Sequence, residues 1–548
     1  MGVEMTARLM RLGLAAGIVA LACSGRATQA AGSDLRLVDA AAQQDKAAVR
    51  RLLKSGLDVN TPQADGSTAL LWVAHWNDLE TADLLIAARA NVNTANDRGV
   101  TPLALAAENA SAAMVEKLLK AGANPNLAQA SGQTPLMTAS RTGSVDVVKL
   151  LLGGTAVLAP TSRANVNASI NATGQTALMW AVAERRRDVV RLLIDAGANV
   201  HAASKIGFTP LLFTARNGDI ETAKLLIASG VGVNEPGSDG TEALPLATVS
   251  AQPDYAMFLI EQGANPNSQM SGVRALHAAA GPVDMWIREW LRARGIDSVF
   301  GTGVVGLPLD RRLQLVKALL AKGADPNPRT TTTTGVQGWL TTKHGAFEPF
   351  SVGTGNLKGA TPLWIASFAA NRGGGFPGAL SAGEAGMRAQ ATYGDIIKAL
   401  LAAGADYRLT TDDKTTPLMA AAGLGQGTFS PGRPRGVRST SAEEAVAILV
   451  GAGADVNAIN EANFTALHGA AFRGLNEVIQ YLVDHGANLN AQDFMQRTAF
   501  RIAEGSKQTF QFQEWPETAE FVKKLGADTS LGVAGRVQER QREVGKQD

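Results

Sequence analysis

A short phrase that begins with Thr recurs along the chain at a fixed spacing of 33 residues. It reads Thr-Ala-Leu from Thr68, and Thr-Pro-Leu from Thr101 and from Thr134. The same spacing separates Thr176 from Thr209. A period of this length indicates that one supersecondary unit is repeated, and such units bury their apolar faces by stacking on their neighbours. The 548 residues are therefore not expected to divide into the three or four globular domains that length alone would suggest.

A second phrase, Gly-Ala followed by Asn or Asp, comes after the Thr phrase by about two turns of helix plus a loop. Thr before Pro can cap the start of a helix, and Pro suits the first turn because its missing N–H is no loss there. Gly favours a helix end, where a left-handed residue is common. Each unit is thus expected to hold a short Ala-rich helix, a Leu-rich helix and a turn. The second phrase begins at Gly122, Gly197, Gly263 and Gly453.

The two phrases, in fixed order and at a fixed period, resemble the ankyrin repeat family. The family pattern is a Thr-Pro-Leu-His start, an Ala-rich helix, a Gly turn, a Leu-rich helix, Gly-Ala-Asp and a β-turn. The resemblance implies an all-α fold, an α-solenoid of about twelve helix–turn–helix/β-turn repeats over residues 34–530, with degenerate repeats at both ends. Aromatic residues make up only 5% of the chain, which fits a thin core of small side chains.

Long segments without the pattern interrupt the array, mostly in its C-terminal half. Insertions in a solenoid are more often loops than new domains, and they sometimes carry function. In one of them Trp286 and Trp290 share a face of an expected amphipathic helix. We favour a helix packed onto the solenoid over a partner-binding aromatic pair, and we expect residues 531–548 to be a charged tail. The insertions lie near 155–164, 281–309, 329–357, 373–393 and 423–441.

The first 30 residues resemble a secretory signal peptide. Arg8 and Arg11 precede an apolar run, Leu12 to Cys23, that is too short to span a bilayer, and small residues then lead to Ala30. We expect cleavage near Ala30. Two alternatives stay open: an N-terminal helix that is buried or acts as an anchor, and a lipid anchor on Cys23. Lipidation is disfavoured because Ala20 stands where acylation sites usually have a large aliphatic residue.

Charge and motifs narrow the function. With residues 1–30 set aside, 48 basic and 48 acidic residues remain, so the chain is a poor candidate for binding nucleic acid through phosphates. No metalloprotease, phosphate-loop or serine-hydrolase motif occurs. His277 and His468 occupy the His position of the family's Thr-Pro-Leu-His start, where the resemblance implies a structural role. We expect no enzyme activity, no cofactor and no metal site.

The resemblance implies a protein-binding surface along the concave groove. In ankyrin repeats the residues just after the Ala pair of the first helix face this groove, as do the β-turns. A mixture of Arg, aromatic and amide side chains is typical of binding hot spots. The alternative is that these side chains are merely solvated or pack on the insertions. The turns carry Asp97, Arg98, Lys205, Phe208 and Phe464, and the candidate partner-binding residues are His75, Trp76, Glu108, Asn109, Arg141, Arg216, Asn217, Phe368, Phe472 and Arg473, with Trp339, Phe347 and Phe350 in the 329–357 insertion.

These observations favour an exported protein-binding scaffold in a bacterial periplasm. We expect a monomer that binds a protein partner. We expect no membrane span, because no segment after the N-terminal run has 18 or more uninterrupted apolar residues. The alternative function is an enzyme subunit, or a receptor for a glycan or small ligand, with its site built by the insertions between residues 281 and 441.

Overall fold

The computed structural model describes residues 34–153, 163–294, 297–298, 301–302, 306–332, 357–371, 391–424, 438–508 and 511–532. Three of the candidate binding residues, Trp339, Phe347 and Phe350, lie outside this part of the chain. The predicted signal peptide, Cys23 and the C-terminal tail beyond residue 532 lie outside it as well. So do most of the predicted insertions at 155–164, 329–357, 373–393 and 423–441.

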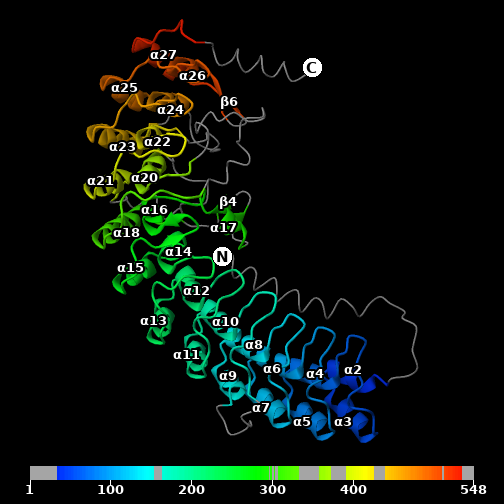
Figure 1. Ribbon diagram of the computed structural model, residues 1–548. Helices are drawn as coiled ribbons and strands as arrows, with labels where there is room; N and C mark the ends of the chain where they lie inside the picture. The colour runs from blue at the N-terminus through cyan, green and yellow to red at the C-terminus, as the bar shows by residue number, and fades with distance from the viewer. Residues whose placement is uncertain are drawn as a thin grey trace. The chain divides into compact units, whose positions relative to one another are not determined.

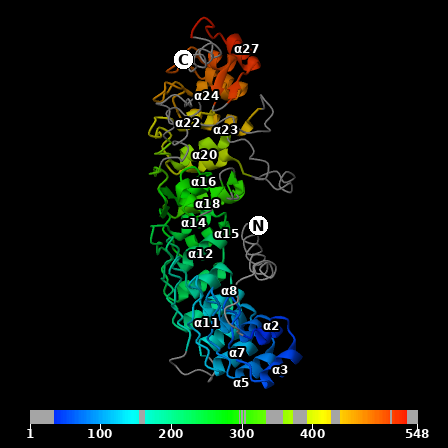
Figure 2. The same ribbon diagram turned by 90° about the vertical axis from the view of Figure 1, so that its right-hand side faces the viewer.

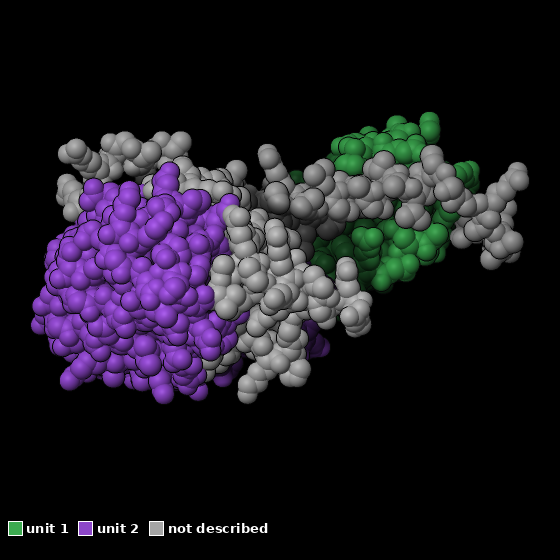
Figure 3. Space-filling model, turned by 90° about the horizontal axis from the view of Figure 1, so that it is seen from above, with its two compact units in different colours: residues 1–130, 155–162 green, residues 131–154, 163–548 purple. Residues whose placement is uncertain are grey.

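The chain forms two compact units (Figure 3). Unit 1 covers residues 1–130 and 155–162, and unit 2 covers residues 131–154 and 163–548. The described part of unit 1 is a stack of three antiparallel helix pairs. The first helix of each pair is almost fully buried, and the second exposes one face. The pairs are α2 (Arg36–Ala42) with α3 (Lys46–Lys54), α4 (Ala69–His75) with α5 (Leu79–Ala87), and α6 (Pro102–Glu108) with α7 (Ala112–Lys120).

Unit 2 continues the same pattern, and its described part holds nine helix pairs that follow one another in chain order (Figures 1 and 2). The twelve pairs of the two units confirm the predicted all-α repeat fold. The pairs of unit 2 are α8 (Pro135–Thr142) with α9 (Val145–Leu151), α10 (Ala177–Ala183) with α11 (Arg187–Asp195), α12 (Pro210–Asn217) with α13 (Ile220–Ala228), α14 (Ala243–Val249) with α15 (Pro253–Glu261), α16 (Ala275–Ala280) with α18 (Leu309–Ala321), α20 (Pro362–Asn371) with α21 (Tyr393–Ala402), α22 (Pro417–Ala421) with α23 (Thr440–Gly451), α24 (Ala466–Arg473) with α25 (Asn476–Asp484), and α26 (Ala499–Glu504) with α27 (Pro516–Lys524).

Strands are few and short in the described residues. They form three antiparallel hairpins of two strands each, and in the first of these Gln269 pairs with Arg274. A further short helix, α17 (Arg288–Arg292), lies between α16 and α18. The hairpins are β1 (Gln269–Met270) with β2 (Val273–Arg274), β3 (Asp297–Ser298) with β4 (Gly301–Thr302), and β5 (Ser506–Gln508) with β6 (Gln511–Gln513).

The recurring Thr and Ala residues explain why the first helix of each pair forms and where it packs. The hydroxyl oxygen of Thr101 accepts a hydrogen bond from the N–H of Ala104 (3.2 Å), and so caps α6 at its start. Ala106 and Ala107 are completely buried, because their small side chains let neighbouring first helices approach closely. Leu118 on the second helix, α7, is also completely buried, and it completes the apolar core of the repeat.

An asparagine in most of the turns ties one repeat to the next. The side chain of Asn93 accepts a hydrogen bond from the N–H of Asn124 (2.7 Å) and donates one to the carbonyl oxygen of Gly122 (3.1 Å). Gly122 follows the last helix of the next repeat, where carbonyl groups lack helical partners. We call this set of bonds the asparagine ladder. The same two bonds to the next repeat are made by Asn60, Asn167, Asn234, Asn267, Asn327 and Asn457.

Two positions in unit 2 depart from the ladder. His201 stands where the ladder has Asn, and its Nδ1 lies 2.8 Å from a carboxylate oxygen of Glu235 instead. Arg408 stands at the corresponding position four repeats later and pairs with Asp406 of its own turn, with 2.9 Å between Nε and Oδ1. Neither side chain makes the two main-chain bonds that an asparagine makes.

Replacing Asn457 by Ala removes both of its bonds to the next repeat. We expect a loss of about 1–2 kcal/mol, because each hydrogen bond contributes roughly 1 kcal/mol net. The loss should be local, since stability in a repeat array comes from nearest neighbours. Hydrogen exchange should therefore speed up at the N–H of Asn488, which donates to Asn457 (2.8 Å), and stay unchanged before residue 300. Asn488→Ala is the matched control, because the side chain of Asn488 accepts a hydrogen bond from Asn490 within its own turn. An equal loss in that variant would contradict a role for the ladder.

Candidate protein-binding surface

The end of helix α4 holds an exposed aromatic group. Trp76 is 41% exposed, stacks on Trp72 with 6.3 Å between ring centroids, and meets the ring of His75 edge-on at 4.5 Å. The indole N–H of Trp76 donates to the carbonyl oxygen of Ala42 in the preceding repeat (3.2 Å). That of Trp72 donates to Gln63 (2.8 Å). Both rings are thus held in place, and one face of Trp76 stays open to a partner.

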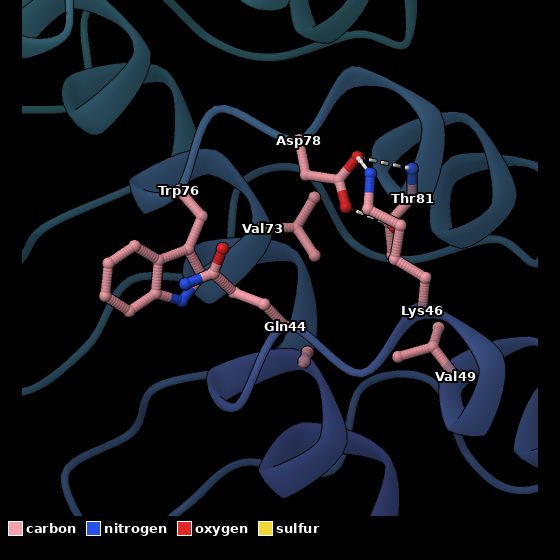
Figure 4. Close-up of a pocket in the computed structure, with 8 residues that line it drawn as sticks. Gln44, Lys46, Val49, Val73, Trp76, Asp78 and Thr81 are labelled. Carbon is pink, nitrogen blue, oxygen red and sulfur yellow. Dashed lines mark hydrogen bonds and ion pairs between the residues drawn. The ribbon is translucent and has the colours of Figure 1, made fainter.

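A small hollow lies beside Trp76, between the first two repeats of unit 1 (Figure 4). Lys46 reaches across it to Asp78, with 2.9 Å between Nζ and Oδ1. Burial opposes the charge on Asp78, but hydrogen bonds from Thr81 and Lys46 outweigh it and lower the pKa of this carboxyl. The two charges therefore neutralise each other within the hollow. It is lined by Ala41, Gln44, Lys46, Val49, Val73, Trp76, Asp78 and Thr81.

The next repeat places Glu108 and Asn109 beside this aromatic group. Burial lowers the pKa of His75, and this effect outweighs the negative charge of Glu108, which acts in the opposite direction. The side-chain amide of Asn109 donates to the carbonyl oxygens of Ala74 (3.1 Å) and His75 (2.9 Å). Asn109 therefore positions the end of α4, whereas Glu108 is exposed.

In unit 2 the corresponding helix ends carry arginines. The guanidinium of Arg141 lies 5.5 Å from the ring centroid of Trp180, a cation–π contact between the first helices of two successive repeats. Arg216 is exposed at the end of α12, and Arg473 is half-buried at the end of α24. The side-chain amide of Asn217 lies 3.4 Å from the carbonyl oxygen of Val182, in the same position relative to its neighbour as Asn109.

Trp180 is a surface residue that the sequence reasoning missed. It stands four residues after Thr176, just as Trp72 stands four residues after Thr68. Both tryptophans are half-buried at the same register of their helices. The repeat pattern therefore contained the signal that would have found Trp180.

Two of the predicted partner-binding residues belong to the core, and the prediction was wrong for them. Phe368 is 4% exposed and stacks on Trp364 with 5.1 Å between ring centroids. Phe472 is 2% exposed and meets Phe464, which is itself fully buried, at 5.6 Å. In these repeats aromatic rings from the helix and the turn fill the space that small residues fill elsewhere. The turn residue Phe208 is fully buried for the same reason.

The tryptophans of the 281–309 insertion are packed on the solenoid, as favoured from the sequence. Trp286 is buried, and its N–H donates to the carbonyl oxygen of Leu357 (3.0 Å). The N–H of Trp290 lies 3.0 Å from Asp239 and 3.1 Å from Thr241, in the turn of an earlier repeat. Helix α17 begins at Arg288, so it includes Trp290 but not Trp286, and the two rings do not share one helix face as predicted.

The histidines of the Thr-Pro-Leu-His position are structural, as predicted. His277 Nδ1 accepts from the N–H of Arg274 (2.9 Å), and its Nε2 donates to the carbonyl oxygen of Pro328 (3.0 Å). His468 makes the same pair of bonds, to Thr465 and Arg497. Burial lowers the pKa of His277 to about 4, so its ring is neutral and each nitrogen is used once. These rings brace the turns and do not face a ligand.

Within the described ranges, His, Cys, Asp and Glu residues do not gather into a group of three or more that would hold a metal ion. The same part of the chain contains no helix with both the length and the apolar character needed to cross a membrane.

The chain belongs to the ankyrin repeat family. A family model described as ankyrin repeats (3 copies) matches residues 37–129, 113–204, 201–270 and 437–512, which together make up more than half of the chain. The solved structure of the human ASB11 ankyrin repeat domain is 27% identical over 41% of this chain and 96% of that one, with a TM-score of 0.35. A search of curated proteins finds no match. Ankyrin repeat proteins are generally protein-binding scaffolds and typically not enzymes.

The buried neutral His277 predicts acid sensitivity. Its pKa is about 4 in the folded chain against 6.5 for the free group, so its contribution to stability is complete above pH 6.5 and is lost as the pH falls toward 4. Between pH 7 and pH 5 the chain should lose about 2 kcal/mol through this residue. Urea unfolding of the native chain and of His277→Gln at both pH values measures it. Equal losses in the two proteins would rule out His277 as the source.

Proposed function

We propose that this chain is a protein-binding scaffold and that the partner docks where the first helices of the repeats end. The observation that carries the proposal is the exposed ring of Trp76, which neighbouring residues hold in one position. A large, rigid aromatic group loses little conformational entropy on binding, and such groups dominate the energetics of protein interfaces.

The surroundings of Trp76 match the anatomy of a binding site. Its N–H is already satisfied by Ala42, so a partner covers the ring without leaving a buried donor unpaired. Glu108 and the Lys46–Asp78 ion pair provide a polar rim around the apolar ring. An apolar centre with a polar rim is typical of protein interfaces.

Replacing Trp76 by Ala should reduce partner capture at least tenfold, because a central aromatic residue contributes 2 kcal/mol or more (about thirtyfold) in many interfaces. The test places a photo-crosslinking phenylalanine analogue at Glu108 and compares crosslinked partner in the native chain and in Trp76→Ala. Phe494→Ala is the control, since Phe494 is an aromatic residue of similar exposure (46%) in another repeat. A partner that crosslinks to Trp76→Ala as well as to the native chain would contradict the proposed surface.

We also propose that the scaffold acts after export, in a bacterial periplasm. Arg8 and Arg11 ahead of the apolar run from Leu12 to Cys23, followed by small residues up to Ala30, support this proposal. A chain that loses its first 30 residues has no cysteine, because Cys23 is the single cysteine. Its folding would then be independent of the oxidising conditions of that compartment.

Expression in a bacterium with an intact export system tests this second proposal. We expect the periplasmic fraction to contain a chain whose N-terminal residue lies near Ala31, as read by sequencing. Arg8→Glu with Arg11→Glu should hold the precursor in the cytoplasm, because the charged region directs insertion. A full-length chain in the cytoplasm would refute export, and a lipid-modified Cys23 would replace the soluble form by a lipoprotein.

A further inference from the structure

Arginines gather at the ends of three successive repeats of unit 2. They come from the end of α8, from the loop and exposed face of α11, and from the end of α12. The first helices of these repeats pack side by side, since α10 contacts both α8 and α12 (Figure 1). We call this cluster the arginine surface, and it consists of Arg141, Arg185, Arg186, Arg187, Arg191 and Arg216.

The charges of the arginine surface are largely uncompensated. Arg185, Arg191 and Arg216 are exposed and form no ion pair with any described residue. Arg187, whose side chain is 51% exposed, approaches Asp219 only at 4.0 Å. Elsewhere in the described residues, basic side chains do form close ion pairs with acids of a neighbouring repeat, as Lys46 does with Asp78 and Lys117 with Asp83.

The acids nearby do not balance these charges. Glu184 and Asp188 are the acidic residues within residues 184–191, and neither forms an ion pair with the arginines. Asp219 and Glu221 of the next repeat also interact with Arg187, which leaves Arg185, Arg191 and Arg216 without an acidic partner among the described residues, in a chain that has 48 basic and 48 acidic residues beyond residue 30. The positive charge is therefore a local property of this surface.

The arginine surface also places a cation at a helix start where several other repeats have a capping side chain. At the residue before the second helix, four other repeats have Asp45, Asp78, Ser111 and Asp219, and each of these side chains caps its helix. Ser144, Gln252 and Leu475 stand at this position in three further repeats and form no side-chain cap. At α11 that position holds Arg186, whose side chain makes no cap. A cation at a helix start is unfavourable because the helix dipole already places positive charge there. A negatively charged partner would offset this unfavourable charge.

Contacts between two successive repeats hold Arg186 and Arg141 in position. A Cβ at Gly143 would lie 2.6 Å from the Cδ of Arg186, so the glycine leaves room for this side chain to cross to the previous repeat. There the Nε of Arg186 donates to the carbonyl oxygen of Arg141 (3.2 Å). Arg141 in turn lies over the ring of Trp180. The site is therefore ordered before a partner arrives.

We propose that the arginine surface binds an acidic segment of a protein partner. This inference rests on the proposed scaffold function and names the chemistry of the partner. Guanidinium groups bind carboxylates through two parallel hydrogen bonds, which lysines cannot do. Two steps between packed helices, each 8–10 Å, span about 20 Å, which an extended segment of about six residues covers. The overall charge balance argues against a nucleic acid, which needs a long basic stripe.

The experiment measures binding of a fluorescein-labelled decapeptide of alternating Asp and Glu to the full chain, by fluorescence polarisation. A decapeptide of alternating Asn and Gln is the uncharged control. The variant Arg185→Gln, Arg187→Gln, Arg191→Gln removes three exposed charges and keeps Arg186, which packs on Gly143. The matched control Arg51→Gln, Lys54→Gln, Lys524→Gln removes three exposed charges elsewhere.

We expect the native chain to bind the acidic peptide at least tenfold more tightly than the uncharged one. The arginine variant should lose at least tenfold, while the matched control retains affinity. Equal affinities for the two peptides, or equal losses in the two variants, overturn the inference. Tighter binding of a 20-base-pair DNA duplex than of the acidic peptide, with the same dependence on the arginines, also overturns it. Crosslinking of a partner near Trp76 tests the scaffold function independently of the peptide. If crosslinking is retained but the acidic peptide does not bind, the arginine surface is rejected and the scaffold function stands.

Discussion

The hydrogen bonds of the asparagine ladder set the geometry on which the rest of the array depends. No repeat buries its own apolar face, so each must meet the next at a fixed distance and angle. Asn suits this position because one short side chain both donates and accepts. It satisfies a carbonyl that the helix end leaves free, as Asn93 does for Gly122, and an N–H of the following turn. Aspartate has no donor and would repel that carbonyl.

A frame fixed by a few residue types leaves other positions free to vary. The Thr cap, the buried Ala pair and the ladder Asn define where each first helix ends, whatever residue stands there. Trp76, Glu108, Arg141 and Arg216 all stand at such ends, and their chemistry differs from repeat to repeat. The regular frame therefore presents an irregular row of side chains, and the character of each site follows from which neighbours it has.

The period predicted the fold well and the surface only in part. Thr caps and helix-ending glycines act locally, so their spacing was enough to place the helix pairs. Burial depends on what packs above a residue: Phe368 and Phe472 stand at exposed positions of the pattern, yet Trp364 and Phe464 draw them into the core. The hydrogen bonds of Trp286 and Trp290 join residues 71 and 51 positions away, and no periodicity carries that information.

His201 and Arg408 give the array two seams. At His201 one side-chain hydrogen bond to Glu235 replaces the two main-chain bonds that join repeats elsewhere, and the side chain of Arg408 bonds only within its own turn. A rod assembled with strong and weak joints bends at the weak ones. We therefore expect elastic deformation of unit 2 to concentrate at these two seams, so that the blocks between them keep their shape while their relative angles adjust to a load.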